Sequence, residues 1–161
     1  MFAYILDLIY PNLCLGCGKD LPKDIEHICL SCRLSLPISD TIDVKDNSFE
    51  KLFWGRVEVL AACYFLVFEK NNITQSLIHN LKYKGQKELG VTLGKFCALY
   101  WQNKSFFKNI DVVVPIPIHK KKKEIRGYNQ SEYLAKGISE VLGLQLDSNS
   151  LIKEVNTSSQ T

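Results

Sequence analysis

The sequence predicts an α/β fold that begins with a small cysteine-rich module. Four of the six cysteines fall within the first 32 residues as two Cys-x-x-Cys pairs. Further along, an apolar run from Ile110 to Ile116 precedes a helical pattern, as in half of a β-α-β unit. The chain has 161 residues, 46% of them hydrophobic and 23% charged, which is typical of a globular protein. We expect one domain, or one domain plus a small module.

The two cysteine pairs are a candidate metal site. Cys14 and Cys17 flank one tight turn and Cys29 and Cys32 flank another, with eleven residues between the pairs. Four thiolates suit tetrahedral Zn²⁺, which binds sulfur at about 2.3 Å, and a site with four protein ligands is structural because no position stays open for substrate. His27 could replace one ligand, but four cysteines leave it a bystander. The other interpretation is four unligated thiols.

The N-terminal segment indicates in which cellular compartment the protein is expected. Residues 1–11 are largely apolar but contain Asp7, have no basic flank and reach only about half the length of a bilayer span, so they indicate neither a signal peptide nor a membrane helix. Without a secretory signal, clustered cysteines indicate metal binding rather than disulfides. We expect a cytoplasmic protein with no membrane span.

The middle of the chain predicts a linker followed by mixed secondary structure. Residues 11–37 show no sustained period, as expected where a metal replaces a core, and residues 38–50 are polar like a linker. The run from Val57 to Phe68 is apolar, β-branched and aromatic, which predicts a strand or hairpin with Cys63 as a small core residue. We therefore place the module and linker at 1–50 and the α/β domain at 51–161.

Two helices are predicted next. Asn71 or Asn72 offers an N-cap for a helix that reaches about Lys84 and stops at Gly85. The second helix is expected to bury one apolar face, and its members are Leu89, Leu93, Phe96, Cys97 and Tyr100. Cys97 is interpreted as a core residue because its neighbours on that face are aliphatic and aromatic.

The sequence from residue 110 onward predicts an incomplete parallel sheet. The run from Ile110 to Ile116 reads as a strand buried on both faces. A third helix starts near Ser131, capped by Asn129, and ends at Gly143. About eighteen residues follow, too few for the further strands that a parallel sheet needs. The chain therefore looks cut short.

The loop after the predicted strand is a candidate phosphate or pyrophosphate site. Residues 1–50 carry a net charge of −4 and residues 51–161 a net charge of +7, which permits a phosphate-bearing partner. Ligands of open α/β sheets bind at the carboxyl ends of strands, where lysines, an arginine fork and a helix N-terminus favour anions. A solvated basic loop is the alternative. The candidate residues are Pro115, Ile116, Pro117, His119, Lys120, Arg126, Gly127, Asn129 and Gln130.

Five segments in this order resemble the ComF (competence protein F) family. They are Tyr10-Pro11 before the cysteine pairs, Leu81 to Gly85, Asp111 to Pro117, Arg126 to Gln130, and Thr157 to Thr161. The resemblance spans nearly the whole chain and implies a zinc ribbon joined to a type I phosphoribosyltransferase-like domain, with residues 115–120 as the pyrophosphate loop. It also implies a role in natural competence, the uptake and handling of single-stranded DNA.

One family feature is absent from the sequence. The 5-phosphoribosyl-1-pyrophosphate (PRPP) loop, an acidic pair followed by Thr-Thr-Gly, does not occur, and no Asp-Asp pair exists in the 161 residues. The groups that would hold the ribose hydroxyls and Mg²⁺ are therefore missing. We expect a ComF-like protein that is inactive as a transferase in this form; Mg²⁺ and PRPP would belong to a full-length relative.

Two other interpretations remain. The chain could be a binding module for single-stranded DNA or a competence helicase, with bases stacked on aromatic rings, although aromatic residues at helical spacing are more often core. The candidate rings are Trp54, Tyr83, Trp101 and Tyr128. It could also be a fragment that folds poorly, because half a parallel sheet exposes an apolar edge and face.

Overall fold

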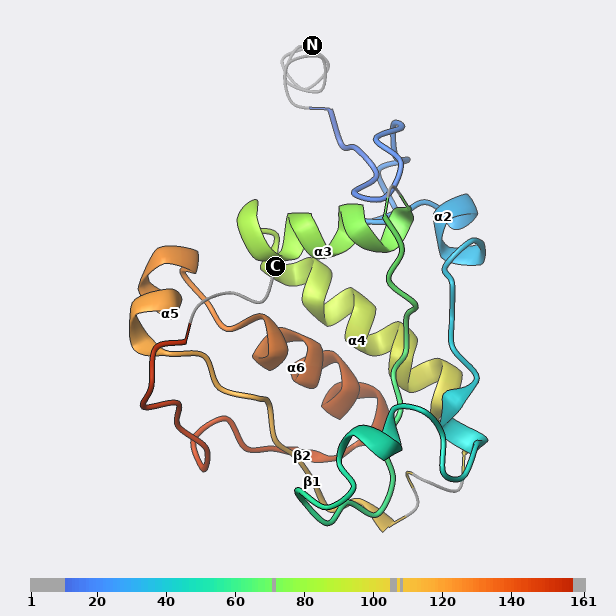
Figure 1. The fold of residues 1–161 in the computed structure, drawn as a ribbon. Helices are drawn as coiled ribbons and strands as arrows, with labels where there is room; N and C mark the ends of the chain where they lie inside the picture. Colours follow the sequence, from blue (N-terminus) through green and yellow to red (C-terminus); the bar gives the residue numbers. More distant parts are fainter. Residues whose placement is uncertain (1–10, 71, 105–106, 108, 158–161) are drawn as a thin grey trace.

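The computed structural model describes residues 11–157 apart from 71, 105–106 and 108 (Figure 1). In chain order the elements are α2 (Leu30–Leu34), η1 (Thr41–Asp43), η2 (Glu50–Leu52), α3 (Ile73–Tyr83), α4 (Lys87–Trp101), β1 (Val112–Val113), α5 (Lys120–Arg126), α6 (Gln130–Leu142) and β2 (Gln145–Leu146). Mixed helices with one small sheet are compatible with the predicted α/β class. Within the described ranges, no helix is both long and apolar enough to cross a membrane.

Helix α3 follows the sequence prediction. The side chain of Asn72 accepts a hydrogen bond from the backbone N–H of Gln75 and caps the N-terminus. At the other end Gly85 has a φ of 69°, a left-handed conformation that favours glycine and ends the helix after the Lys84 cap. Its buried face carries Leu77 and Leu81, which are at most 2% exposed.

Helix α4 buries two faces rather than one. Leu89 and Leu93 enter the main core as predicted, whereas Tyr100 is 48% exposed and lies outside it. The second face carries Gly90 and Gly94, which pack against α6. The apolar period revealed the first face only, because glycines add nothing to a hydrophobic pattern.

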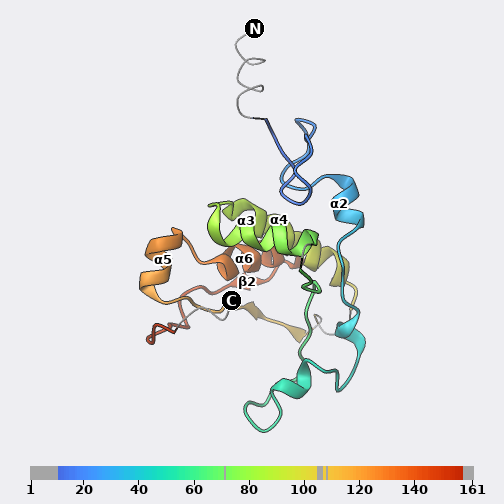
Figure 2. The ribbon, with the colours of Figure 1, turned by 45° about the horizontal axis from the view of Figure 1, so that its top comes forward.

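Helices α4 and α6 lie against each other at backbone contact distance. A Cβ atom added to Gly94 would stand 2.1 Å from the carbonyl oxygen of Leu134, and one added to Gly137 would stand 2.2 Å from the carbonyl oxygen of Val91. Helix α6 begins at the Asn129 cap and ends at Gly143, whose φ is 66°, as the sequence predicts. It contacts α4 and both strands, so it links the helical layer to the sheet (Figures 1 and 2).

The sheet is smaller and more exposed than predicted. Strand β1 pairs in parallel with β2, Val112 opposite Gln145 and Val113 opposite Leu146. The predicted strand from Ile110 to Ile116 is therefore wrong in length, and its burial on two faces is wrong as well, since Val112 is 41% and Ile116 is 76% exposed. Helices α3, α4 and α6 lie on one side of the strands (Figure 2). The short segment after Gly143 supplies one strand of two residues, β2.

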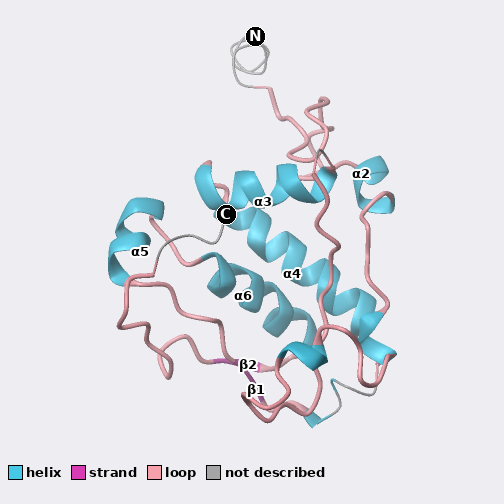
Figure 3. Ribbon diagram, in the orientation of Figure 1, coloured by secondary structure: helices cyan, strands magenta, loops and turns pink. Residues whose placement is uncertain are grey.

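The predicted strand or hairpin from Val57 to Phe68 does not form; this segment is loop (Figure 3). A single antiparallel bridge joins Leu66 to Ile38, and Leu60 is 97% exposed. Other backbone N–H groups of this segment bind side chains where a strand would bind a neighbouring strand. The N–H of Ala62 donates to Glu50 Oε1 at 3.2 Å, and the N–H of Tyr64 donates to Thr41 Oγ1 at 3.3 Å. These backbone N–H groups are therefore satisfied by side chains of the preceding loop and not by a neighbouring strand.

The predicted linker at 38–50 is held together by one buried amide. The Nδ2 group of Asn47 donates to the carbonyl oxygens of Thr41, Val44 and Ala62 at 3.3, 3.0 and 2.8 Å. Its Oδ1 accepts from the backbone N–H groups of Phe49 and Glu50, both at 2.9 Å. The side chain is only 6% exposed. These residues therefore form a structured loop and not a simple linker.

The cysteine-rich segment shares the main core. Its buried apolar side chains, those of Leu21, Ile28 and Leu36, belong to the same cluster as Leu77 of α3 and Leu89 of α4. Ile28 is fully buried. The expectation that a metal replaces the core in this segment therefore needs correction, because hydrophobic packing against α3 and α4 holds it as well.

Candidate metal centre and basic turn

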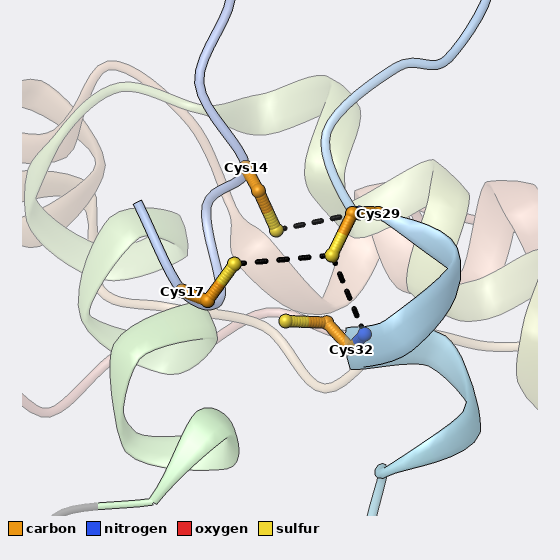
Figure 4. Close-up of side chains that lie close together, drawn as sticks. All are labelled: Cys14, Cys17, Cys29 and Cys32. Carbon is orange, nitrogen blue, oxygen red and sulfur yellow. Dashed lines mark hydrogen bonds between the residues drawn. The ribbon is translucent and has the colours of Figure 1, made fainter. Parts of the chain in front are cut away.

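The four predicted metal ligands come together in the structure. The sulfur atoms of Cys14, Cys17, Cys29 and Cys32 all lie within 4.8 Å of one another (Figure 4). The Sγ atoms of Cys17 and Cys29 are 3.8 Å apart. A tetrahedral zinc ion with Zn–S bonds of about 2.3 Å places its sulfurs about 3.8 Å apart, so the cluster fits such an ion with little movement.

Two chain segments build the cluster. The first pair lies on a tight hairpin, in which the N–H of Cys14 donates to the carbonyl oxygen of Lys19 and the N–H of Gly18 donates to that of Cys14, both at 2.8 Å. The second pair lies at the start of α2, where Cys29 is the N-cap and its sulfur accepts from the N–H of Cys32 at 3.4 Å. The N–H of Cys29 in turn donates to the sulfur of Cys14 at 3.3 Å, across the two segments.

Helix α3 anchors the first hairpin. The carbonyl oxygen of Leu15 accepts hydrogen bonds from Ser76 Oγ at 2.8 Å and from Asn80 Nδ2 at 3.1 Å. Next to it, a Cβ atom on Gly16 would lie 3.0 Å from the sulfur of Cys32 and 3.2 Å from Ile73, so glycine lets the hairpin approach both. Sequence reasoning missed Ser76 and Asn80. Their only signal was a polar pair at i and i+4 on an amphipathic helix.

The thiol pKa values diverge within the cluster. Burial raises the pKa of Cys14, but hydrogen bonds from the backbone amides of Cys29, Cys17 and Gly16 and from the Cys17 side chain lower it to about 6. Burial and the neighbouring cysteines raise the pKa of Cys32 above its ordinary value. A thiolate at one position thus opposes a second one nearby, and a divalent cation among the sulfurs removes that opposition.

His27 and the other two cysteines stand apart from the cluster. The Nδ1 atom of His27 lies 3.1 Å from Thr92 Oγ1 of α4, in agreement with its interpretation as a bystander. Burial raises the pKa of Cys97 to about 12, which keeps this thiol protonated and unreactive, and burial also raises the pKa of Cys63.

The basic segment forms a helix where we expected a loop. Lys120–Arg126 is α5, with His119 as its N-cap: the ring Nδ1 accepts from the N–H of Lys121 at 3.2 Å. Gly127 ends the helix with a φ of 80°. Gly127 thus acts as a left-handed helix cap, and its role of allowing close backbone approach to a ligand stays a prediction.

The proline turn before α5 is tied to the start of α6. The carbonyl oxygen of Ile116 accepts a hydrogen bond from Asn129 Nδ2 at 3.1 Å and another from the hydroxyl of Ser131. Asn129 also caps α6 by accepting from the N–H of Ser131. Pro115 is buried and Pro117 is partly buried. The polar atoms of Asn129 are therefore engaged within the protein in this structure.

Helix α5 separates the remaining candidate residues. His119 and Lys120 lie at its N-terminal end and Arg126 at its C-terminal end, about 10 Å along the axis. Arg126 Nη1 donates to Gln130 Oε1 at 3.1 Å, and its guanidinium lies 5.8 Å from the ring centroid of Tyr83. The Nε2 group of Gln130 is buried and has no hydrogen-bond partner in the described structure.

Two of the four aromatic rings proposed to stack on bases are unavailable. Trp101 is 4% and Tyr128 is 6% exposed, so both are core residues and that part of the expectation is wrong. Trp54 and Tyr83 are more than half exposed. Aromatic side chains pack in a hydrophobic core as well as they stack on bases, and the sequence pattern did not distinguish core rings from exposed ones.

Comparisons with protein-family models, curated proteins and solved structures gave no match.

Proposed function

We propose that the chain is a ComF-like, phosphoribosyltransferase-type protein of the cytoplasm whose four clustered cysteines hold one structural zinc ion. The observation that carries this proposal is the gathering of four sulfur atoms within 4.8 Å of one another. All ligands would be protein sulfurs, so the ion would stabilise the fold and take no part in chemistry. By resemblance, the protein acts in DNA uptake.

The proposed phosphate site is the N-terminal end of α5. Lys120 is exposed there, and His119 stands beside it on a turn whose backbone is fixed through the carbonyl of Ile116. Because the sequence has no acidic pair for ribose and Mg²⁺, we propose that this polypeptide binds phosphate groups without transferring phosphoribosyl groups.

Calorimetric titration of pyrophosphate into the zinc-loaded protein tests this site. The wild type should bind, and Lys120→Gln should bind at least several-fold more weakly, because a phosphate contact from a lysine is lost. Lys51→Gln, at an exposed lysine on η2, is the matched control and should leave the affinity unchanged. Absence of binding by the wild type would contradict the phosphate site, and release of pyrophosphate from PRPP would contradict the lack of transfer.

A second candidate function is the binding of single-stranded DNA through the basic α5 and the exposed ring of Tyr83. The observation that favours it is the position of Arg126 beside that ring. The partners proposed for this function are single-stranded DNA and, by resemblance, a helicase of the competence machinery.

A further inference from the structure

A pocket of about 350 Å³ lies between the C-terminal end of α3 and helix α5. Its lining residues are Lys82, Tyr83, Gly85, Lys122, Ile125 and Arg126. We call it the Tyr83 pocket. Three of these residues are cations and none is acidic. From the sequence, Arg126 was expected in a phosphate site with His119 and Lys120, and Tyr83 was a candidate ring for stacking on bases; the pocket brings these two residues together.

The charge of the Tyr83 pocket favours an anion. The C-termini of α3 and α5 each contribute at most about half a negative charge through their carbonyl groups. Lys82, Lys122 and Arg126 contribute three full positive charges, so the positive charge prevails. Among the described residues, the neighbouring Lys123 pairs with Glu132 at 3.9 Å, and this acidic side chain lies on α6, outside the pocket lining.

The same pocket offers flat surfaces. The side chain of Tyr83 is 55% exposed, and the planar guanidinium of Arg126 stands 5.8 Å from its ring centroid, oriented by Gln130. Ile125, 85% exposed, adds an apolar side chain. Unpaired bases stack on aromatic rings and on arginine planes, while lysines bind the phosphates between them. A duplex conceals the faces of its bases and cannot use such a surface.

A hydrogen bond within the protein connects the two sides of the pocket before any ligand binds. Tyr128 follows Gly127, the cap of α5, and its hydroxyl donates a hydrogen bond to the carbonyl oxygen of Leu81. Leu81 in turn precedes Lys82 of the pocket. This bond is buried and spans 47 residues of sequence. It fixes the end of α3 relative to the end of α5, so a ligand does not have to assemble the site, and the entropy cost of binding is reduced.

We propose that the Tyr83 pocket binds one nucleotide unit of single-stranded DNA, with its base against Tyr83 and Arg126 and the adjoining phosphates on Lys82 and Lys122. A volume near the lower limit of small-ligand sites, about 300 Å³, suits one unit and excludes several. The inference deepens the second proposed function, and the choice of DNA rests on it.

Fluorescence anisotropy of a labelled oligothymidylate about 12 nucleotides long, added to the zinc-loaded full chain, tests the proposal. Tyr83→Ala should weaken binding about 5- to 150-fold at every salt concentration, because stacking is lost. Tyr83→Phe keeps the ring and should bind like the wild type. The double variant Lys82→Gln/Lys122→Gln should lower the slope of log affinity against log salt by about 1.4, as expected for two lost phosphate contacts.

Phe68→Ala is the matched control, because it removes an exposed ring outside the pocket, and it should bind like the wild type. Oligonucleotide binding that Tyr83→Ala leaves intact would overturn the pocket and leave DNA binding itself standing. Failure of the wild type to bind the oligonucleotide while it still binds pyrophosphate would overturn the pocket and leave the phosphate site standing. Equal affinity for thymidine monophosphate and the oligonucleotide would also overturn the proposal, since it would assign the pocket to free nucleotides.

Discussion

The phenolic hydroxyl of Tyr128 donates a hydrogen bond to the backbone carbonyl oxygen of Leu81, linking the turn before α6 to the last turn of α3. Tyr128 is 6% exposed and its ring meets that of Tyr133 edge to face, with centroids 5.3 Å apart. The bond satisfies a carbonyl near a helix end and holds together the two segments that border the Tyr83 pocket.

Tyr128→Phe should lower the free energy of unfolding by about 1 to 3 kcal/mol, because the carbonyl of Leu81 loses its buried partner while the ring stays in place. Urea denaturation measures this change. Tyr100→Phe is the matched control: its hydroxyl makes only a 3.5 Å contact with Asp40 on the surface, and its loss should change stability by less than about 0.5 kcal/mol. Equal effects of the two variants would contradict the assigned role of Tyr128.

The stabilising effect of Tyr128 should also depend on pH. Burial and Tyr133 raise the pKa of its phenol, while Arg126 lowers it, and the net direction is upward. The folded state thus favours the neutral ring. The contribution is fully present below the pKa of an unfolded tyrosine, about 10, and is lost as pH rises through the folded value. The stability gap between wild type and Tyr128→Phe should therefore narrow above pH 10; a gap that widens there would contradict this assignment.

Gly94→Ala and Gly137→Ala should each destabilise the fold by about 1 to 3 kcal/mol or more, because the new methyl group meets a backbone carbonyl of the opposite helix and forces α4 and α6 apart. Thermal unfolding followed by circular dichroism measures the loss. Lys136→Ala, at an exposed position of α6, is the control and should stay within about 0.5 kcal/mol of the wild type. If both glycine variants were as stable as the wild type, the close packing of α4 against α6 described above would be contradicted.

Asn47→Asp should loosen the loop formed by residues 41–62. The carboxylate still accepts from Phe49 and Glu50, but it cannot donate to the three carbonyl oxygens that Asn47 Nδ2 now binds. The expected result is faster limited proteolysis within this loop at unchanged protection of α4. Asp46→Asn, at the exposed neighbouring residue, should behave like the wild type. Protection of the loop in Asn47→Asp would contradict this role.

Helix ends were predicted well because they depend on local chemistry. Asn72, Gly85, Asn129 and Gly143 act as caps in the structure as they do in the sequence pattern. The failures depend on partners distant in sequence. Val57 to Phe68 has strand propensity but lacks a paired neighbour over most of its length, and the Ile110 to Ile116 run pairs over two residues only.

For the candidate sites too, features that depend on local sequence were predicted and features that depend on distant partners were not. The cysteine spacing predicted the metal cluster directly, although the second pair lies at the start of α2 and not on the expected second tight turn. Spacing could not show that Ser76 and Asn80 would anchor Leu15, or that α5 would place His119 and Arg126 at opposite ends. It also could not bring Lys82 and Tyr83 next to Arg126, because that pocket depends on the packing of α3 against the turn after α5.

The metal content of the purified, reduced chain tests the central claim most directly. Native mass spectrometry should find one zinc ion per chain in the wild type, and none after replacement of both Cys14 and Cys32 by serine, because two remaining sulfurs cannot complete the tetrahedron. Cys97→Ser, which lies outside the cluster, should retain the ion. A wild-type chain that is folded but carries no metal after purification with zinc, or a Cys14/Cys32 double variant that still carries one, would contradict the account.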